Sequence, residues 1–293
     1  MRAPLRGLLR AMLPGIVSGL LFFSLSATNS ALAAPETTLD NSCWDITFFE
    51  PFDELKLASA ENPEGWTTQY IWDRSTIINN ELQYYVDPRQ HPVNPFNVDD
   101  GVLTISATPT PNDLLSSTEQ QPYISGVLTS RQWFEQQYGR FEVRAKVPKG
   151  QGLWSAFWML PTHSSWPQGI AVLPELDIME HLGHEVSTYH TTLHTNQTGA
   201  LSSHPYDHNR LGDLTDGYHL YSAVWTQEEV SWYLDGKYLV SHPSPKDFDN
   251  PKHFLLNLAV GGSWPGSPNA STVFPAKYQI DFVRAMKRNN KCS

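Results

Sequence analysis

The sequence predicts an all-β fold, on three observations. Short segments with alternating apolar and polar residues recur at 101–107, 140–147 and 230–235, and this alternation is typical of strands. Asp235-Gly236 lies between two strand-like segments, and an Asp-Gly pair predicts a tight hairpin turn. The 22 prolines are spread along the chain, and no long segment has helical periodicity. One all-β domain is the simplest prediction.

Residues 1–33 are predicted to be a signal peptide that lies outside the fold. A basic start precedes an apolar segment, residues 16–25, and Ala31-Leu32-Ala33 supplies the small residues of a cleavage site. The apolar segment is short for a membrane span, so a membrane anchor is the weaker alternative. We therefore expect a secreted protein, extracellular or periplasmic, in which residues 34–293 form one domain.

The charge of the chain argues against two classes of partner. Removal of Arg2, Arg6 and Arg10 with the signal peptide would change the formal net charge from −10 to −13. Nucleic acids and anionic membranes both favour clustered Lys and Arg, and the sequence contains no such cluster. We expect no nucleic-acid partner, no membrane association after signal removal, and no redox or nucleotide cofactor.

The chain has two cysteines, Cys43 and Cys292, near the two ends of the predicted domain. In an oxidising compartment an even pair predicts a disulfide, and the termini of one domain often lie close together. Two unpaired thiols are the alternative. With so few thiols and no CxxC spacing, a zinc site is not expected.

Three acids, Glu175, Asp177 and Glu180, fall within six residues and are separated by apolar residues. In a regular strand Glu175 and Asp177 share a face, whereas Glu180 would point the other way. A β-bulge formed by Met179, or by Ile178 and Met179 together, would return Glu180 to the same face. Solvent-facing acids on an edge strand are the alternative interpretation.

A row of three carboxyl groups suits glycoside hydrolysis. Retaining glycosidases use two carboxyl groups about 5–5.5 Å apart, one as nucleophile and one as acid and then base. The middle acid can hydrogen-bond one glutamate and hold it in place. Crowding also raises the pKa of at least one carboxyl group, which keeps a proton available near neutral pH.

The pattern E-x-D-x-x-E beside the Trp-rich segment 152–161 resembles glycoside hydrolase family 16, in its laminarinase-like or exopolysaccharide-depolymerase-like branch. The extra residue before the last Glu is typical of that branch and absent from the lichenase-like one. Further segments similar to the family follow in the family's order, at 79–85, 138–148, 190–194, 232–236, 256–262 and 281–284.

The resemblance implies a curved β-jelly-roll sandwich of two antiparallel sheets with a concave substrate cleft. It also implies retaining endo-hydrolysis of β-1,3- or mixed β-1,3/1,4-linked glucans, or of a related bacterial exopolysaccharide. Glu175 would be the nucleophile, Asp177 its supporting partner and Glu180 the acid/base. A transglycosylase and a non-catalytic β-glucan-binding protein are the alternatives. A monomer acting on a polysaccharide is expected.

The resemblance also implies residues that surround the acids. The candidate sugar contacts are Asn80, Arg131, Trp154, Trp158, His194 and Trp264. Core packing is the alternative for Trp158, and a surface charge for Arg131. A metal shared by His190 and His194 is a weaker interpretation, since their spacing suits a helix and Thr191-Thr192 favours a strand.

No cofactor is expected to take part in catalysis, but the resemblance implies a structural calcium on the convex side. Glu50 and Asp281 are the candidate carboxylate donors, and backbone carbonyls would complete the oxygen shell.

One position departs from the family pattern. Pro174 stands directly before Glu175, where the family usually has Gly. Proline fixes φ and has no N–H, which alters the entrance to the predicted strand. Pro at this position also occurs in relatives that act on bacterial exopolysaccharides, so the polymer stays open.

Overall fold

The computed structural model describes residues 39–74, 76–162 and 174–291. By its internal contacts the chain divides into a short unit, Met1–Ala33, and a domain, Ala34–Ser293. The predicted signal peptide and Cys292 lie outside the described residues. Within the described ranges, no helix is long and apolar enough to cross a membrane.

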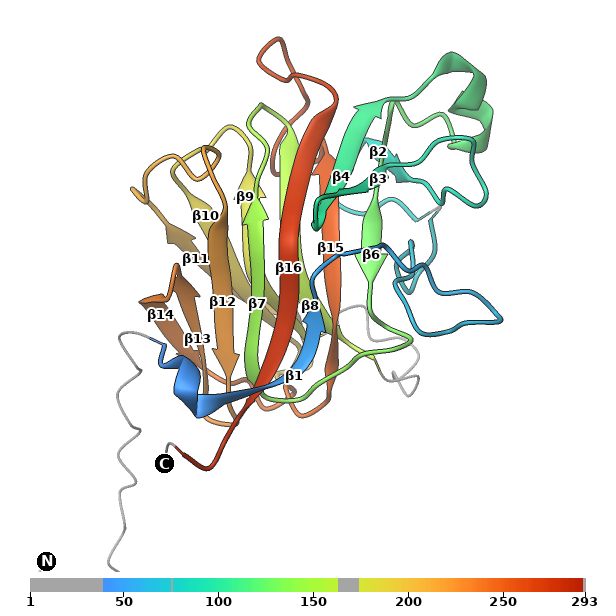
Figure 1. Cartoon of the computed structure of the whole chain (residues 1–293). Helices are drawn as coiled ribbons and strands as arrows, with labels where there is room; N and C mark the ends of the chain where they lie inside the picture. Colours follow the sequence, from blue (N-terminus) through green and yellow to red (C-terminus); the bar gives the residue numbers. More distant parts are fainter. Residues whose placement is uncertain (1–38, 75, 163–173, 292–293) are drawn as a thin grey trace, which may run out of the picture. The chain divides into compact units, whose positions relative to one another are not determined.

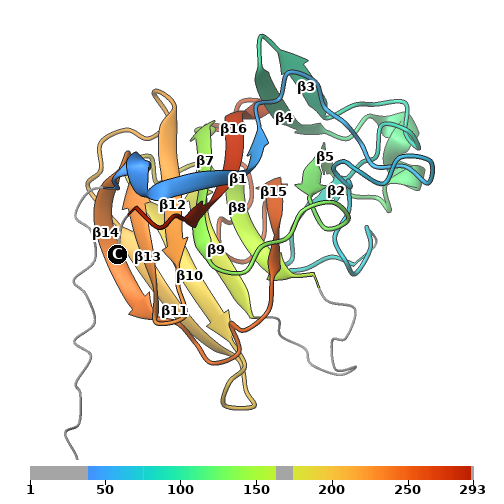
Figure 2. The same cartoon turned by 60° about the horizontal axis from the view of Figure 1, so that its bottom comes forward.

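The described part of the domain is built from two sheets (Figures 1 and 2). All strand pairs are antiparallel except β2 with β5. The ten-stranded sheet comprises β1 (Trp44–Glu50), β2 (Gln83–Tyr85), β3 (Phe96–Asp99), β4 (Val102–Pro109), β5 (Tyr123–Ser125), β7 (Gly139–Lys146), β12 (His219–Trp225), β13 (Glu229–Leu234), β14 (Lys237–Pro243) and β16 (Ala276–Arg288). Two short 3-10 helices are η1 (Asn41–Cys43) and η2 (Asn112–Ser117). The all-β prediction is confirmed.

The six-stranded sheet carries the acids. Its strands follow the order β11-β10-β9-β8-β15-β6. Their bounds are β6 (Val127–Thr129), β8 (Leu153–Pro161), β9 (Glu175–Leu182), β10 (Tyr189–Thr195), β11 (Ser202–His208) and β15 (Lys252–Val260).

Alternation along the strands gives this sheet two apolar faces. On β15, Phe254 and Leu256 belong to the main core, which includes buried residues of both sheets. Leu255, between them, belongs to a second cluster with Trp158 and Tyr70. Because successive side chains of a strand point to opposite faces, the second cluster lies on the face that is turned away from the main core.

The predicted hairpin and bulge are both present. Asp235 and Gly236 join β13 to β14 with positive φ angles of 51° and 77°, as a tight hairpin turn requires. In the β8–β9 ladder, Phe157 pairs with Met179 and Trp158 pairs with Asp177, so Ile178 is left without a partner in the ladder. The bulge is therefore formed by Ile178 and Met179 together, opposite Phe157, and the prediction of Met179 alone as the extra residue is wrong. The β9–β10 ladder shifts register at the same place.

The two ends of the domain lie side by side. Trp44 of β1 pairs with Arg288 of β16, and the Asn289 N–H donates to the Cys43 carbonyl at 2.9 Å. Cys43 is buried and disulfide-bonded. Its pairing with Cys292 stays a prediction, because Cys292 lies outside the described residues.

Candidate active site

A groove of about 920 Å³ lies on the face of the six-stranded sheet that carries the second apolar cluster. All three predicted catalytic acids line it. Trp154, Trp158, His194 and Trp264 line it as well, together with Tyr70, Ile71, Trp72, Thr76, Ile78, Asn79, Glu81, Ala156, Thr192, Leu201, Ser203, Pro205, Asn257 and Ser263. The bulge therefore has the predicted consequence, a row of carboxyl groups on one face.

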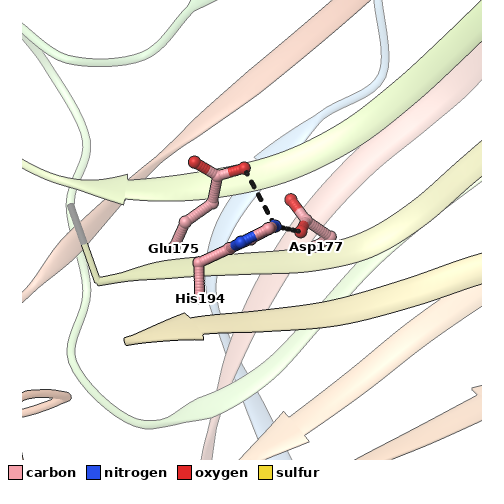
Figure 3. Close-up of side chains that lie close together, drawn as sticks. All are labelled: Glu175, Asp177 and His194. Carbon is pink, nitrogen blue, oxygen red and sulfur yellow. Dashed lines mark ion pairs between the residues drawn. The ribbon is translucent and has the colours of Figure 1, made fainter. Parts of the chain in front are cut away.

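His194 lies between the first two acids (Figure 3). Its Nε2 is 3.2 Å from Asp177 Oδ2 and 4.0 Å from Glu175 Oε1. The β9–β10 register sets this position, since His194 pairs directly with Glu175. Ser203 holds the other ring nitrogen, with Oγ 2.8 Å from Nδ1.

The environment raises the pKa of both acids near His194. For Glu175 the causes are burial and the charge of Asp177, and His194 opposes them. For Asp177, burial and the charge of Glu180 raise the pKa to about 6, again against His194. Burial alone would lower the pKa of His194, but the hydrogen bond and charge of Asp177 raise it to about 9. His194 is therefore an imidazolium at neutral pH and compensates one negative charge.

Glu180 lies beyond the bulge, where the whole residue is only 9% exposed. Burial and the charge of Glu175 raise its pKa to about 8. Thr192 Oγ1 is 3.5 Å from Oε2, a weak contact. The indole of Trp154 lowers the pKa in part, although its Nε1 makes no regular hydrogen bond with the described residues. Glu180 therefore carries a proton at neutral pH and can donate it.

On one side of the acids, buried polar contacts hold an aromatic wall in place. Trp158 pairs with Asp177 across the ladder, and its Nε1 donates to Asn257 Oδ1 at 2.7 Å. Asn257 Nδ2 in turn donates to the Tyr85 hydroxyl at 3.2 Å. The ring of Tyr70 packs edge-on against Trp158 at 5.6 Å. Trp158 thus lines the groove and packs at the same time, so the two interpretations are compatible.

On the other side the aromatic residues are freer. Trp264 is 44% exposed and meets Trp154 edge-on at 5.2 Å. The ring of His190 lies 4.8 Å from Trp264. His190 is held by Asp207, 2.8 Å from Nδ1, and by Glu185, 3.0 Å from Nε2. His190 and His194 therefore have separate partners, and these contacts do not favour a metal shared by the two.

Two predicted sugar contacts lie outside the lining. Arg131 is exposed and does not line the groove, which favours the alternative of a surface charge. Asn80 is also exposed and donates to Ser263 Oγ at 2.7 Å. Its neighbour Asn79 lines the groove instead. Both asparagines have positive φ, 54° and 56°, and the turn geometry decides which of them faces the groove.

The candidate calcium donors have other partners. Glu50 accepts from the Phe52 N–H at 3.0 Å through Oε1 and from the Trp66 indole at 3.1 Å through Oε2. Asp281 Oδ2 forms an ion pair with Arg144 at 2.5 Å. Since calcium takes six to eight oxygen ligands, these contacts do not favour binding by this pair, and the calcium site stays a prediction.

The donor atoms of Glu175, Asp177 and His194 lie within 4.8 Å of one another, which is close enough to converge on an ion. Metal ligands must be deprotonated. The pKa of His194, raised to about 9, opposes that state. The cluster is better described as a charge-compensated set of acids.

Sequence reasoning missed several lining residues, among them Tyr70, Thr192 and Asn257. Asn257 lies inside the segment 256–262 that carried the family resemblance, so the signal was present. Tyr70 lies outside the strands and the family segments, and only the tertiary structure brings it to Trp158.

Comparison with known proteins agrees with the geometry. Residues 80–284 match the model of glycosyl hydrolases family 16. The endo-1,3-1,4-beta-glycanases EglC and ExsH of Rhizobium meliloti are 37% and 36% identical over 91% and 85% of this chain. The chain spans little more than half of their lengths, 57% and 53%.

A solved structure, the laminarinase catalytic domain from Thermotoga maritima, superimposes with a TM-score of 0.70 at 33% identity. The match covers 84% of this chain and 99% of that one. The predicted resemblance is confirmed: the chain belongs to glycosyl hydrolases family 16.

Proposed function

We propose that this chain is a secreted, retaining endo-β-glucanase that hydrolyses β-1,3- or mixed β-1,3/1,4-linked glucans. The observation that carries the proposal is the acid row on the groove floor, with His194 beside Glu175 and a protonated Glu180 beyond the bulge. The printed activities of the relatives, endo-1,3-1,4-beta-glycanase and laminarinase, support the same substrate class.

The first step forms a glycosyl-enzyme. A carboxylate oxygen of Glu175 attacks the anomeric carbon while Glu180 gives its proton to the departing glycosidic oxygen. The C–O bond to the leaving sugar breaks, and an ester bond to Glu175 forms. Asp177 and His194 hold Glu175 from the side, and the imidazolium favours the ionised form of the nucleophile.

The second step releases the product. Glu180, now ionised, takes a proton from water, and the oxygen of that water attacks the anomeric carbon. The ester bond breaks, which returns Glu175 as a carboxylate and Glu180 as an acid. Two inversions leave the anomeric configuration unchanged.

The charge of the groove favours a neutral polymer over an acidic exopolysaccharide. The acidic side chains among its described lining residues are Glu81 and the three catalytic acids, and its one cation among them is the imidazolium of His194. No Lys or Arg lines it there, and residues 163–173 contain neither. Apart from His194, which is occupied by Asp177, an acidic polymer would find none of the Arg or Lys partners that carboxylates prefer among these residues.

Two alternatives remain open to the same test. A transglycosylase would use the same nucleophile but pass the glycosyl unit to a sugar in place of water. A non-catalytic glucan-binding protein would have no use for three acids gathered at the groove floor. We further propose that the protein acts as a monomer.

The test is an activity screen on laminarin, lichenan and an acidic bacterial exopolysaccharide, with analysis of the products. We expect laminarin or lichenan to be hydrolysed into short oligosaccharides. NMR spectra recorded during the reaction should show that the new reducing ends first appear in the β-configuration. Products of initial α-configuration would contradict the retaining mechanism. Longer oligosaccharides would identify a transglycosylase, and binding without cleavage a lectin-like protein.

A further inference from the structure

Lys252, the first residue of β15, is fully buried, with 0% of its surface exposed. Its ammonium lies 4.2 Å from the ring of Phe248 and 5.2 Å from that of Trp225, both in the main core. In the part of the chain that the structure describes, no carboxylate forms an ion pair with it. Burial of an ammonium costs several kcal/mol, so an apolar side chain of similar size would be the more stable choice.

The polar contact of Lys252 leads to the acid row. Its Nζ donates to the Pro174 carbonyl at 2.8 Å. That carbonyl and the nitrogen of Glu175 belong to one planar peptide group. A hydrogen bond to the carbonyl therefore restrains the orientation of the Pro174–Glu175 peptide plane. Because the Glu175 backbone continues from this plane, the direction of the Glu175 side chain is restrained as well.

The backbone ladder does not supply this restraint. The β8–β9 ladder ends where Met159 pairs with Leu176. Continued by two residues, the same register would set Pro161 opposite Pro174. Neither proline has an N–H, so neither can donate to the other. Lys252 pairs with Pro161 from the far side of β8. Lys252 lies on β15, one strand further from β9 than Pro161, and its side chain supplies to the Pro174 carbonyl the N–H donor that Pro161 lacks.

We propose that Lys252 is a positioning residue for Glu175, which it holds through the Pro174 carbonyl. The proposal rests on the proposed function, in which Glu175 is the nucleophile. Burial lowers the pKa of Lys252 to about 7, against the charges of Asp247, Asp249 and Glu175. The contact does not depend on the charge, because a neutral amine still has N–H groups to donate.

The test is Lys252→Met, which keeps the length and apolar character of the side chain and removes the donor. On laminarin, or on lichenan if that is the better substrate, we expect kcat to fall about 10- to 100-fold with KM changed by less than about threefold. The midpoint of thermal unfolding should stay the same or rise, because a buried charge has been removed.

A second measurement isolates the nucleophilic step. Inactivation by an activated 2-deoxy-2-fluoro-β-glucosyl compound needs Glu175 but little help from Glu180, because the leaving group departs without protonation. We expect Lys252→Met to slow this inactivation by the same factor as kcat. Lys237→Met, at an exposed position of β14, is the matched control and should change neither rate.

Three outcomes would overturn the proposal: an unchanged kcat, an inactivation rate like that of the wild type, or a variant that loses stability together with activity. The last includes a variant that fails to fold, since the buried lysine would then be structural. A wild-type protein that cleaves none of the glucans would instead contradict the proposed function, so the two failures are distinguishable.

Discussion

Glu175 and Glu180 lie on the same strand, five residues apart, yet their surroundings differ. The Glu175 side chain is 27% exposed and lies 4.0 Å from the Nε2 atom of a protonated histidine. Glu180 is buried, with 9% of the whole residue exposed, and the described residues provide it with no ion pair. The comparison shows that burial raises the pKa of both carboxyl groups, whereas their neighbours differ: His194 opposes the rise for Glu175, and Glu180 has no such counter-charge among the described residues.

The largest effect is expected from removal of the nucleophile. Glu175→Ala should lower kcat on laminarin by more than about 10⁴-fold, because no covalent intermediate can form. Sodium azide should restore activity and give an α-glycosyl azide, since azide then attacks the substrate directly from the side of the missing carboxylate. A β-glycosyl azide from this variant would show that Glu175 is the acid/base and would leave Glu180 as the nucleophile.

Glu180→Ala should have a smaller effect that depends on the leaving group. We expect a loss of about 10²- to 10⁴-fold on laminarin, the usual contribution of a general acid. On a 2,4-dinitrophenyl β-glucoside of suitable length the first step should stay fast, because that leaving group needs no proton. Equal losses on both substrates would show that Glu180 does more than protonate. The fold is checked by the circular dichroism spectrum.

The histidine between the first two acids tests the role of the counter-charge. His194→Gln should reduce kcat about tenfold and move the acidic limb of the pH profile to higher pH. The sign follows from the charge: His194 lowers the pKa values of Asp177 and Glu175, so without it the nucleophile ionises later. The alkaline limb, set by Glu180 with a pKa of about 8, should stay near its wild-type position. An unmoved acidic limb would contradict the argument.

The smallest effect is expected in the aromatic wall. Trp158→Phe keeps a ring in the groove but loses the donor to Asn257, now at 2.7 Å. We expect KM for laminarin to rise about three- to tenfold, with kcat changed less, because one buried hydrogen bond contributes about 1 kcal/mol. Trp264→Phe, on the freer side, should change KM less than Trp158→Phe. A larger change in KM for Trp264→Phe than for Trp158→Phe would mean that the exposed Trp264 contributes more to sugar binding than the buried Trp158.

Much of this site could be predicted from local sequence. The strand period and the five-residue offset between Glu175 and Glu180 required a bulge, and the β8–β9 register has it. The spacing of Trp154 and Trp158 placed them on one face of a strand, and the family resemblance implied that this face lines the cleft. Prediction was weaker in loops and turns: Asn79 lines the groove in place of Asn80, and Arg131 lies outside it.

The sequence by itself determined the strand alternation, the Asp235-Gly236 turn and the acid row, because each depends on neighbours within a few residues along one strand. Only the tertiary structure decided what surrounds each carboxyl group. Burial and counter-charge come from other strands, as when the β9–β10 register brings His194 to Glu175. The same holds for Lys252, which lies 78 residues from the Pro174 carbonyl that it holds.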